Sequence, residues 1–367
     1  MTTGFFHDER CLWHHGGNYA LTYPVGGFVQ PGGGLPESPE AKRRLVNLMA
    51  VSGLLGEMSV STAPEATRED LLRVHEPAYL DTFKATSDAG GGELGLRTPF
   101  GWGGYEIAAL SAGLAKAALF TVLEGRLTNA YALSRPPGHH ALPDFPNGFC
   151  LINNIAVAVK AAQAAGLAGR VAVIDWDVHH GNGTEAIFWE DPSVLTISIH
   201  QEWNYPLDTG AASARGGAAG QGANANIPLP PGAGHDSYLE AWDRIVAPLL
   251  ARFRPDAIVI ACGYDASAYD PLGRMLATAD TFGMLTDRAR TAAEDLCGGR
   301  LVLVHEGGYS EVHVPFCGHA AIAALAGSAI AAPDPMAETL RARQPMAEWQ
   351  AYYSAYIGRL AEWLLAP

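Results

Sequence analysis

Cysteine is scarce in this chain, and its spacing argues against two classes of protein. The five cysteines are widely separated and form no C-x-x-C pair: Cys11, Cys150, Cys262, Cys297 and Cys317. Neither a disulfide framework nor a thiolate zinc site is expected from such a pattern. The first residues also lack a cationic start followed by an apolar run, which would mark a secretory signal. We therefore expect a cytoplasmic protein.

Basic residues are few relative to acidic ones. The chain has 24 Lys and Arg against 38 Asp and Glu, which gives a net charge of -14. A surface of this sign repels phosphates, so we expect no nucleic-acid partner and no binding to anionic membranes. It would attract cationic substrates, although many soluble proteins are acidic for solubility alone. Residues 314–333 carry no Asp, Glu, Lys or Arg, but His319 and several Gly and Ala residues interrupt them, which predicts a buried helix rather than a membrane span.

Several catalytic motifs are absent. The chain contains no G-x-S-x-G, no Gly-Lys dipeptide and no D-x-H-x-D pair. These absences argue against a serine hydrolase of the nucleophile-elbow type, a P-loop enzyme and a binuclear-manganese ureohydrolase. Residues 90–95 match G-x-G-x-x-G, but they do not lie between a strand and a helix. We therefore reject a dinucleotide site there.

Apolar residues, by contrast, are plentiful and occur in short runs. They make up 48% of the 367 residues, and runs that predict strands lie at residues 130–133, 171–174, 194–199, 257–261 and 301–304. Helical stretches separate several of these runs, which favours an α/β fold with a parallel sheet covered on both faces. The first 70 residues look loop-rich, apart from a helix that begins at Ser38, and residues 335–367 look like a helical tail. Without repeats or linkers, residues 1–367 are predicted to form a single domain.

Polar side chains follow the predicted strands at the point where each strand ends. In a parallel sheet these ends meet at one edge, where ligands bind. Asp177 and His179 lie two residues apart, so on an extended backbone both would point to one side. Asp265, which follows another strand, would complete a three-ligand zinc site with an open position for water. A lone D-x-H pattern would more often be structural, but the neighbouring histidines favour the metal site.

Two further motifs supply candidate catalytic groups. His139 and His140 follow a strand through a rigid Pro-Pro-Gly turn, and histidine is suited to general base catalysis near neutral pH. Tyr309 follows two glycines and could donate a hydrogen bond to a developing oxyanion. Each motif in isolation has a structural interpretation, as a pair of core histidines or as a packed tyrosine.

The motifs together resemble the histone deacetylase superfamily, and most closely its class II type and the bacterial histone deacetylase-like amidohydrolases. The resemblance covers roughly residues 72–325 and rests on these motifs: Arg135-Pro136-Pro137-Gly138-His139-His140, Gly148-Phe149-Cys150, Asp175-Trp176-Asp177-Val178-His179-His180-Gly181-Asn182-Gly183-Thr184, Gly263-Tyr264-Asp265 and Glu306-Gly307-Gly308-Tyr309. It implies the arginase–deacetylase fold, an eight-stranded parallel sheet flanked by helices. It also implies a zinc-dependent amidohydrolase that removes acetyl or related acyl groups from lysine ε-amines.

The resemblance assigns a role to each candidate residue. Zinc would be held by Asp177, His179 and Asp265. His139 and His140 would be the catalytic pair, with His140 as general base and acid. Asp175 would support His139 and Asn182 would support His140, while Tyr309 would polarise the carbonyl. The substrate would contact Gly148, Phe149, Tyr205 and Leu272, and a structural potassium ion would bind to Asp175, Asp177, His179, Ser198 and Ile199.

The sequence leaves the substrate and the assembly open. An acetylpolyamine amidohydrolase is the nearest alternative, but Leu272 replaces the acidic gatekeeper of a polyamine-selective relative. A non-catalytic acetyl-lysine binder is a second alternative. Acylated lysines of peptides or proteins, small acylated amines and hydroxamate-type inhibitors are the expected ligands, and a homo-oligomer is the expected assembly. Tyr205 and Tyr264 stand where Phe is common in the family, and the role of the long N-terminal loop at residues 11–34 is undetermined.

Overall fold

The computed structural model describes residues 2–30 and 32–366. Its main sheet contains eight strands, all parallel, in the order β10-β9-β8-β11-β12-β7-β1-β4. The strands are β1 (Thr3–Phe6), β4 (Ser59–Ser61), β7 (Asn129–Ala132), β8 (Val171–Asp175), β9 (Val194–Gln201), β10 (Asn224–Leu229), β11 (Ala257–Cys262) and β12 (Leu301–His305). This confirms the predicted α/β fold with an eight-stranded parallel sheet in a single domain.

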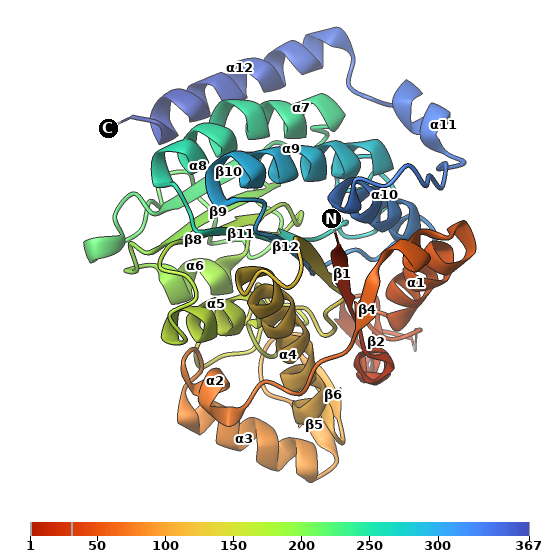
Figure 1. Cartoon of the computed structure of the whole chain (residues 1–367). Coiled ribbons are helices and arrows are strands. Elements are labelled where there is room, and N and C mark those ends of the chain that lie inside the picture. Colours follow the sequence, from red (N-terminus) through yellow and green to blue (C-terminus); the bar gives the residue numbers. More distant parts are fainter. Residues whose placement is uncertain (1, 31, 367) are drawn as a thin grey trace.

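Helices cover both faces of this sheet (Figure 1). Alternate residues of β8 show the two layers, since Ala172 and Ile174 pack in one hydrophobic cluster and Val171 and Val173 in the other. The first cluster involves α1 (Pro39–Ser52), α7 (His235–Ala241), the π-helical segment η4 (Trp242–Val246), α8 (Ala247–Phe253), α9 (Ala279–Cys297), α10 (Val314–Ala326) and α12 (Ala347–Leu364). The second involves α2 (Arg68–Leu72), α3 (Pro77–Asp88), α4 (Gly104–Leu123), α5 (Asn154–Ala164) and α6 (Asn182–Phe188). Because the central strands are buried on both faces, their sequences are continuous apolar runs.

Two predicted helices differ in detail from the expectation. The stretch predicted as one buried helix at residues 314–333 is helical only to Ala326, because Gly327 adopts a left-handed conformation (φ 63°) that ends the helix. The C-terminal tail contains α11 (Ala337–Ala342) and α12, whose residues Tyr353 and Ile357 are buried against the body, whereas Trp349 is exposed. Among the described helices, α4 is long and apolar enough to cross a membrane, and 67% of its most apolar window is buried in the molecule.

The N-terminal part is more regular than its sequence indicated. It contributes β1 and β4 to the main sheet and α1 to one of its faces. Short elements make up much of the remainder: η1 (Glu9–Trp13), the hairpin β2 (Tyr19–Ala20) and β3 (Tyr23–Pro24), and η2 (Leu54–Glu57). Residue 31, in the long N-terminal loop, lies outside the described residues. The glycine-rich residues 90–95 enter a second hairpin, β5 (Gly91–Glu93) and β6 (Pro99–Gly101), and η3 (Ala218–Gly220) precedes β10.

Candidate active site

The predicted metal ligands meet beyond the carboxyl ends of β8 and β11. Ligand atoms of Asp177, His179 and Asp265 all lie within 4.8 Å of one another, and all three residues are buried. His179 Nδ1 is 3.0 Å from Asp177 Oδ1 and 3.1 Å from Asp265 Oδ2. The expectation that Asp177 and His179 share an extended backbone was wrong, because β8 ends at Asp175 and residues 177–179 form a bend. The bend, rather than strand alternation, brings the two side chains together.

This donor set fits a divalent cation. Burial, together with the adjacent Asp177 carboxylate, raises the pKa of Asp265 to about 6, because burial and a neighbouring negative charge both disfavour the ionised carboxyl. Imidazole and carboxylate groups are both zinc ligands, and three protein ligands leave a position open for water, as in catalytic zinc sites. Glycine is needed around them: a Cβ added at Gly263 would lie 2.1 Å from Asp177 Oδ2, and one at Gly307 would lie 2.2 Å from Asp265 Oδ2.

The paired histidines lie beside these ligands. Their ring centroids are 4.0 Å apart. His139 Nδ1 is 2.9 Å from Asp175 Oδ2, and His140 Nδ1 is 2.7 Å from Asn182 Oδ1. Burial favours the neutral form of both rings, but the charges of Asp177 and Asp175 raise the pKa of His139 well above its usual value. Burial and the neighbouring His139 lower the pKa of His140 well below its usual value, so the two environments separate the proton affinities of the pair.

Tyr309 lies beside His179, with ring centroids 6.2 Å apart, in a position that depends on its neighbours. A Cβ atom added at Gly307 would collide with the Asp265 carboxylate, and it would also lie only 2.9 Å from the Tyr309 hydroxyl. The absence of that Cβ therefore allows the phenol to approach the predicted metal ligands. Burial raises the pKa of Tyr309 well above its usual value, so its hydroxyl keeps its proton for donation. The backbone N–H of Tyr309 donates to Asp270 Oδ2 at 2.7 Å.

A cavity of about 170 Å³ leads to these groups. All four predicted substrate-contact residues line it, together with His140, His179 and Tyr309. The complete lining is Thr22, Arg97, His140, Gly148, Phe149, His179, Asn204, Tyr205, Leu272 and Tyr309. Phe149 packs edge-on against Tyr309 at 5.6 Å, and Tyr205 against His140 at 5.1 Å. The aromatic rings thus line a passage that leads to the catalytic groups, which suits a long substrate chain that ends in a polar group.

Other predicted residues lie around the cavity rather than in it. Ser198 is the register partner of Asp175 on the adjacent strand β9, and Ile199 follows it in the core. Tyr264 is fully buried, and its hydroxyl contacts Tyr131 at 3.2 Å and the Cys262 sulfur at 3.3 Å. It is therefore part of the core behind the site and not of the cavity lining.

Two carboxylates next to the site had no role in the prediction. Glu306 Oε2 accepts hydrogen bonds from the backbone N–H groups of Gly138 at 2.6 Å and His139 at 3.1 Å. Asp270 accepts from the N–H groups of Tyr309 and Leu272, the latter at 2.8 Å. The two bonds to Glu306 and the bond from Tyr309 to Asp270 join segments that are far apart in the sequence, so only the motif membership of Glu306 could have suggested a role.

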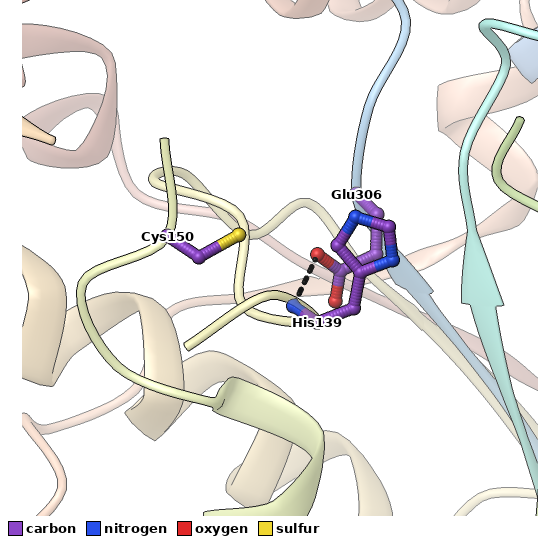
Figure 2. Close-up of side chains that lie close together, drawn as sticks. All are labelled: His139, Cys150 and Glu306. Carbon is purple, nitrogen blue, oxygen red and sulfur yellow. Dashed lines mark hydrogen bonds between the residues drawn. The ribbon is translucent and has the colours of Figure 1, made fainter. Parts of the chain in front are cut away.

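Glu306 also lies close to His139 and Cys150, as Figure 2 shows. These three side chains have a spacing that could hold a metal ion. However, Glu306 Oε2 is already bonded to two backbone donors, and His139 Nδ1 is bonded to Asp175. The hydrogen bonds therefore favour a scaffold role, in which Glu306 holds the turn that carries the histidine pair.

Comparisons with known proteins agree with this geometry. Residues 35–325 match the histone deacetylase domain family. The chain is 55% identical over 361 residues to a histone deacetylase-like amidohydrolase of Pseudomonas aeruginosa, across 98% of this chain and 95% of the relative. It is 40% identical over 308 residues to a probable deacetylase of Archaeoglobus fulgidus, across 82% of this chain and 85% of the relative. The crystal structure of the HDA15 HD domain is 34% identical and superposes with a TM-score of 0.81, across 100% of this chain and 99% of that one. The resemblance drawn from the motifs is confirmed, and the chain belongs to the histone deacetylase family.

Proposed function

We propose that this protein is a zinc-dependent hydrolase that removes acetyl groups from lysine ε-amines. The observation that carries the proposal is the convergence of three groups at one end of a narrow cavity. These are the buried ligand set of Asp177, His179 and Asp265, the histidine pair, and the Tyr309 hydroxyl. When bound to the three ligands, zinc supplies a Lewis acid that acidifies water and polarises a carbonyl.

The side chains supply the proton transfers. Asn182 Oδ1 accepts a hydrogen bond from the Nδ1–H of His140, which leaves Nε2 without a proton and able to act as a base. In the proposed mechanism, His140 Nε2 removes a proton from the attacking water, and the Tyr309 hydroxyl donates to the carbonyl oxygen as negative charge develops. His140 then returns its proton to the amine nitrogen as the C–N bond breaks. Acetate and a free ε-amine are the products.

Lysine is preferred to polyamine as the carrier of the acyl group. None of the described residues that line the cavity is Asp or Glu, and Leu272 is among them. A polyamine carries a second ammonium, which would find no carboxylate there. A purely binding role is disfavoured because His140, Tyr309 and their hydrogen-bond partners are all in place.

We also propose a structural potassium ion bound by Asp175, Asp177, His179, Ser198 and Ile199. The proposal is supported by the register of β8 and β9, in which Asp175 and Ser198 are partners. Side-chain oxygen atoms and backbone carbonyl oxygen atoms are the ligands that a hard cation prefers. Exchange of potassium for a larger organic cation in the buffer should lower the thermal midpoint if this ion contributes to stability.

The deciding experiment measures acetate release from an acetyl-lysine peptide. The protein is assayed as purified, after chelation, and after zinc is restored, beside a Tyr309→Phe variant. We expect release that disappears on chelation, returns with zinc and falls by roughly 100-fold or more in the variant, since loss of one oxyanion donor costs about that much. Wild-type protein that is folded and zinc-loaded but as inactive as the variant would contradict the proposed activity and favour first another acyl or polyamine substrate, and then a binding role.

A further inference from the structure

The mouth of the cavity carries a charge of the opposite sign to the molecule. The chain has a net charge of -14, yet its described cavity-lining residues include one arginine, Arg97, and no Asp or Glu. The remaining lining residues are neutral apart from His140 and His179 at the catalytic end. A substrate that enters the cavity therefore passes one fixed positive charge.

The backbone at Arg97 is tied to the cavity wall. The N–H of Gly148 donates to the carbonyl of Leu96 at 3.0 Å, and the N–H of Phe149 donates to the carbonyl of Arg97 at 3.1 Å. Arg97 itself adopts a left-handed conformation (φ 58°), which an arginine rarely adopts without such support. Its guanidinium lies over the ring of Tyr205, 5.7 Å from the centroid. Both walls of the passage thus hold the arginine at the entrance.

The guanidinium has no anionic partner among the residues that the structure describes. Among residues 2–30 and 32–366, no carboxylate oxygen lies within 4.0 Å of its nitrogens. The nearby Glu93 carboxylate is engaged elsewhere: it accepts hydrogen bonds from the Tyr19 hydroxyl at 2.7 and 2.8 Å and from the Thr98 N–H at 2.9 Å. Arg97 therefore keeps its five N–H donors for a ligand at the entrance.

We propose that Arg97 is a specificity-determining residue that binds a carboxylate of the substrate close to the acylated amine. This rests on the proposed deacetylase function and narrows its substrate class to acyl-lysines with a neighbouring acidic group. The carboxylate could be the side chain of an adjacent Asp or Glu in a peptide, or the α-carboxylate of free acetyl-lysine. Arginine binds carboxylates through paired, charge-assisted hydrogen bonds, and it repels the second ammonium of a polyamine.

The test compares matched substrates. Three acetyl-lysine peptides differ only in the residues on either side of the acetyl-lysine, which are Glu, Gln or Lys. Free Nε-acetyl-lysine and its carboxamide form a second pair, and N-acetylputrescine is added as a cation. For the wild type we expect kcat/KM to rank Glu above Gln above Lys, with a Glu-to-Lys ratio of about 10 or more, which should shrink as salt is raised. A preference for free acetyl-lysine over its carboxamide would identify the α-carboxylate as the source.

Two variants and one control connect the ranking to Arg97. Arg97→Met keeps a long side chain over Tyr205 and should bring the Glu-to-Lys ratio to about 1, and Arg97→Glu should invert it. Arg359→Met is the matched control, because Arg359 also lies over a tyrosine ring, that of Tyr356 at 5.8 Å, but on α12 and outside the cavity lining. The control should keep the wild-type ratio.

Direct binding separates this proposal from the proposed function. The dissociation constants of the same peptides are measured by calorimetry on zinc-loaded protein. In one outcome the peptides bind with this ranking in the wild type, lose the ranking in Arg97→Met, and yet release no acetate. That result would support the proposed role of Arg97 in substrate binding and contradict the proposed hydrolase activity. Equal ratios in the wild type and Arg97→Met, by both turnover and binding, would overturn the role of Arg97 and leave the hydrolase standing.

Discussion

At the scale of the residue, Gly148 determines the width of the passage. It has a positive φ of 51°, and a Cβ at this position would lie 2.4 Å from His140 Cδ2 and 2.9 Å from Tyr205 Cε1. A side chain here would therefore strain the backbone and push both the catalytic ring and the aromatic wall out of place. Only glycine allows both the positive φ and the close approach of His140 and Tyr205 at this position.

We expect Gly148→Ala to lower kcat/KM by about 100-fold, because displacement of a catalytic group by about 1 Å costs roughly that much. Gly103→Ala is the matched control. Gly103 also has a positive φ, 74°, but a Cβ there meets nothing within 4 Å. Both variants should lose about 1 kcal/mol of stability from the positive φ, and Gly148→Ala should lose about 1–3 kcal/mol more from its steric clash, measured by urea unfolding. Only Gly148→Ala should lose activity. Equal activity in the two variants would contradict this account of the wall.

Glu306 acts, by our interpretation, through the backbone of the histidine turn. Glu306→Ala would leave the buried N–H groups of Gly138 and His139 without their acceptor, at a cost of about 1–3 kcal/mol. We expect kcat to fall by about 10- to 100-fold with little change in KM. Glu306→Gln keeps one oxygen acceptor and should recover most of the loss. Failure of Gln to recover more activity than Ala would show that the negative charge, rather than the hydrogen bonds, is required.

At the scale of the element, a buried ion network joins α1 and the N-terminal segment to the loop before the histidine pair. Glu37 contacts Lys42 Nζ at 2.7 Å and an Arg135 guanidinium nitrogen at 3.1 Å, and all three side chains are almost fully buried. Arg135 also donates to the carbonyls of Cys11 at 3.0 Å and His14 at 3.1 Å. Since Arg135 begins the Pro-Pro-Gly-His-His motif, the network connects the long N-terminal loop to the catalytic turn.

Glu37→Gln should destabilise the protein by about 3–5 kcal/mol, because two buried cations lose their partner. Burial alone would raise the pKa of Glu37, but Arg135 and Lys42 lower it to about 2. A carboxyl whose pKa is lowered on folding contributes stability above its unfolded value of about 4.5, and this contribution is lost as the pH falls toward about 2. The difference in unfolding free energy between wild type and variant should therefore shrink below about pH 4.5. Glu40→Gln, three residues later in the first turn of α1 but 39% exposed, should show neither effect.

At the scale of the whole molecule, the parallel sheet brings together groups that are distant in the chain. The predicted metal ligands follow β8 and β11, and Tyr309 follows β12, so the site forms only when the sheet does. A metal at this site binds the folded state alone, which couples metal binding to global stability.

Metal removal should therefore lower the thermal midpoint. Binding at a free concentration of about 100 times Kd adds about 2.7 kcal/mol to the free energy of unfolding. We expect chelation to lower the midpoint by several degrees and zinc to restore it, as measured by calorimetry. Asp265→Asn should show a much smaller response, since it removes one of the three ligands. An equal response in wild type and variant would place the stabilising metal elsewhere.

The sequence by itself determined the class of fold and the candidate chemistry. Buried parallel strands read as apolar runs, and the polar residues after them, such as Asp177, Asp265 and Tyr309, are adjacent to the strands that position them. These patterns involve residues that are adjacent in the chain, so they can be recognised from the sequence alone. The strands β1, β4 and β10 were not recognised. Strands of three or four residues, such as β4 and β1, carry too little periodicity, and Asn224, Asn226 and Pro228 interrupt the apolar run of β10. The cytoplasmic location, the homo-oligomer and the roles of the individual site residues stay predictions.

Only the tertiary structure decided how the site is held and how it is entered. The bend at residues 177–179, the support of the histidine turn by Glu306, and the position of Arg97 against Gly148 and Phe149 all depend on contacts between distant segments. The net charge does not describe the entrance, since a chain with a net charge of -14 lines its cavity with an arginine and no Asp or Glu among the described residues. Net charge is a sum over the whole surface, whereas a substrate responds to the few charges within a Debye length of its path.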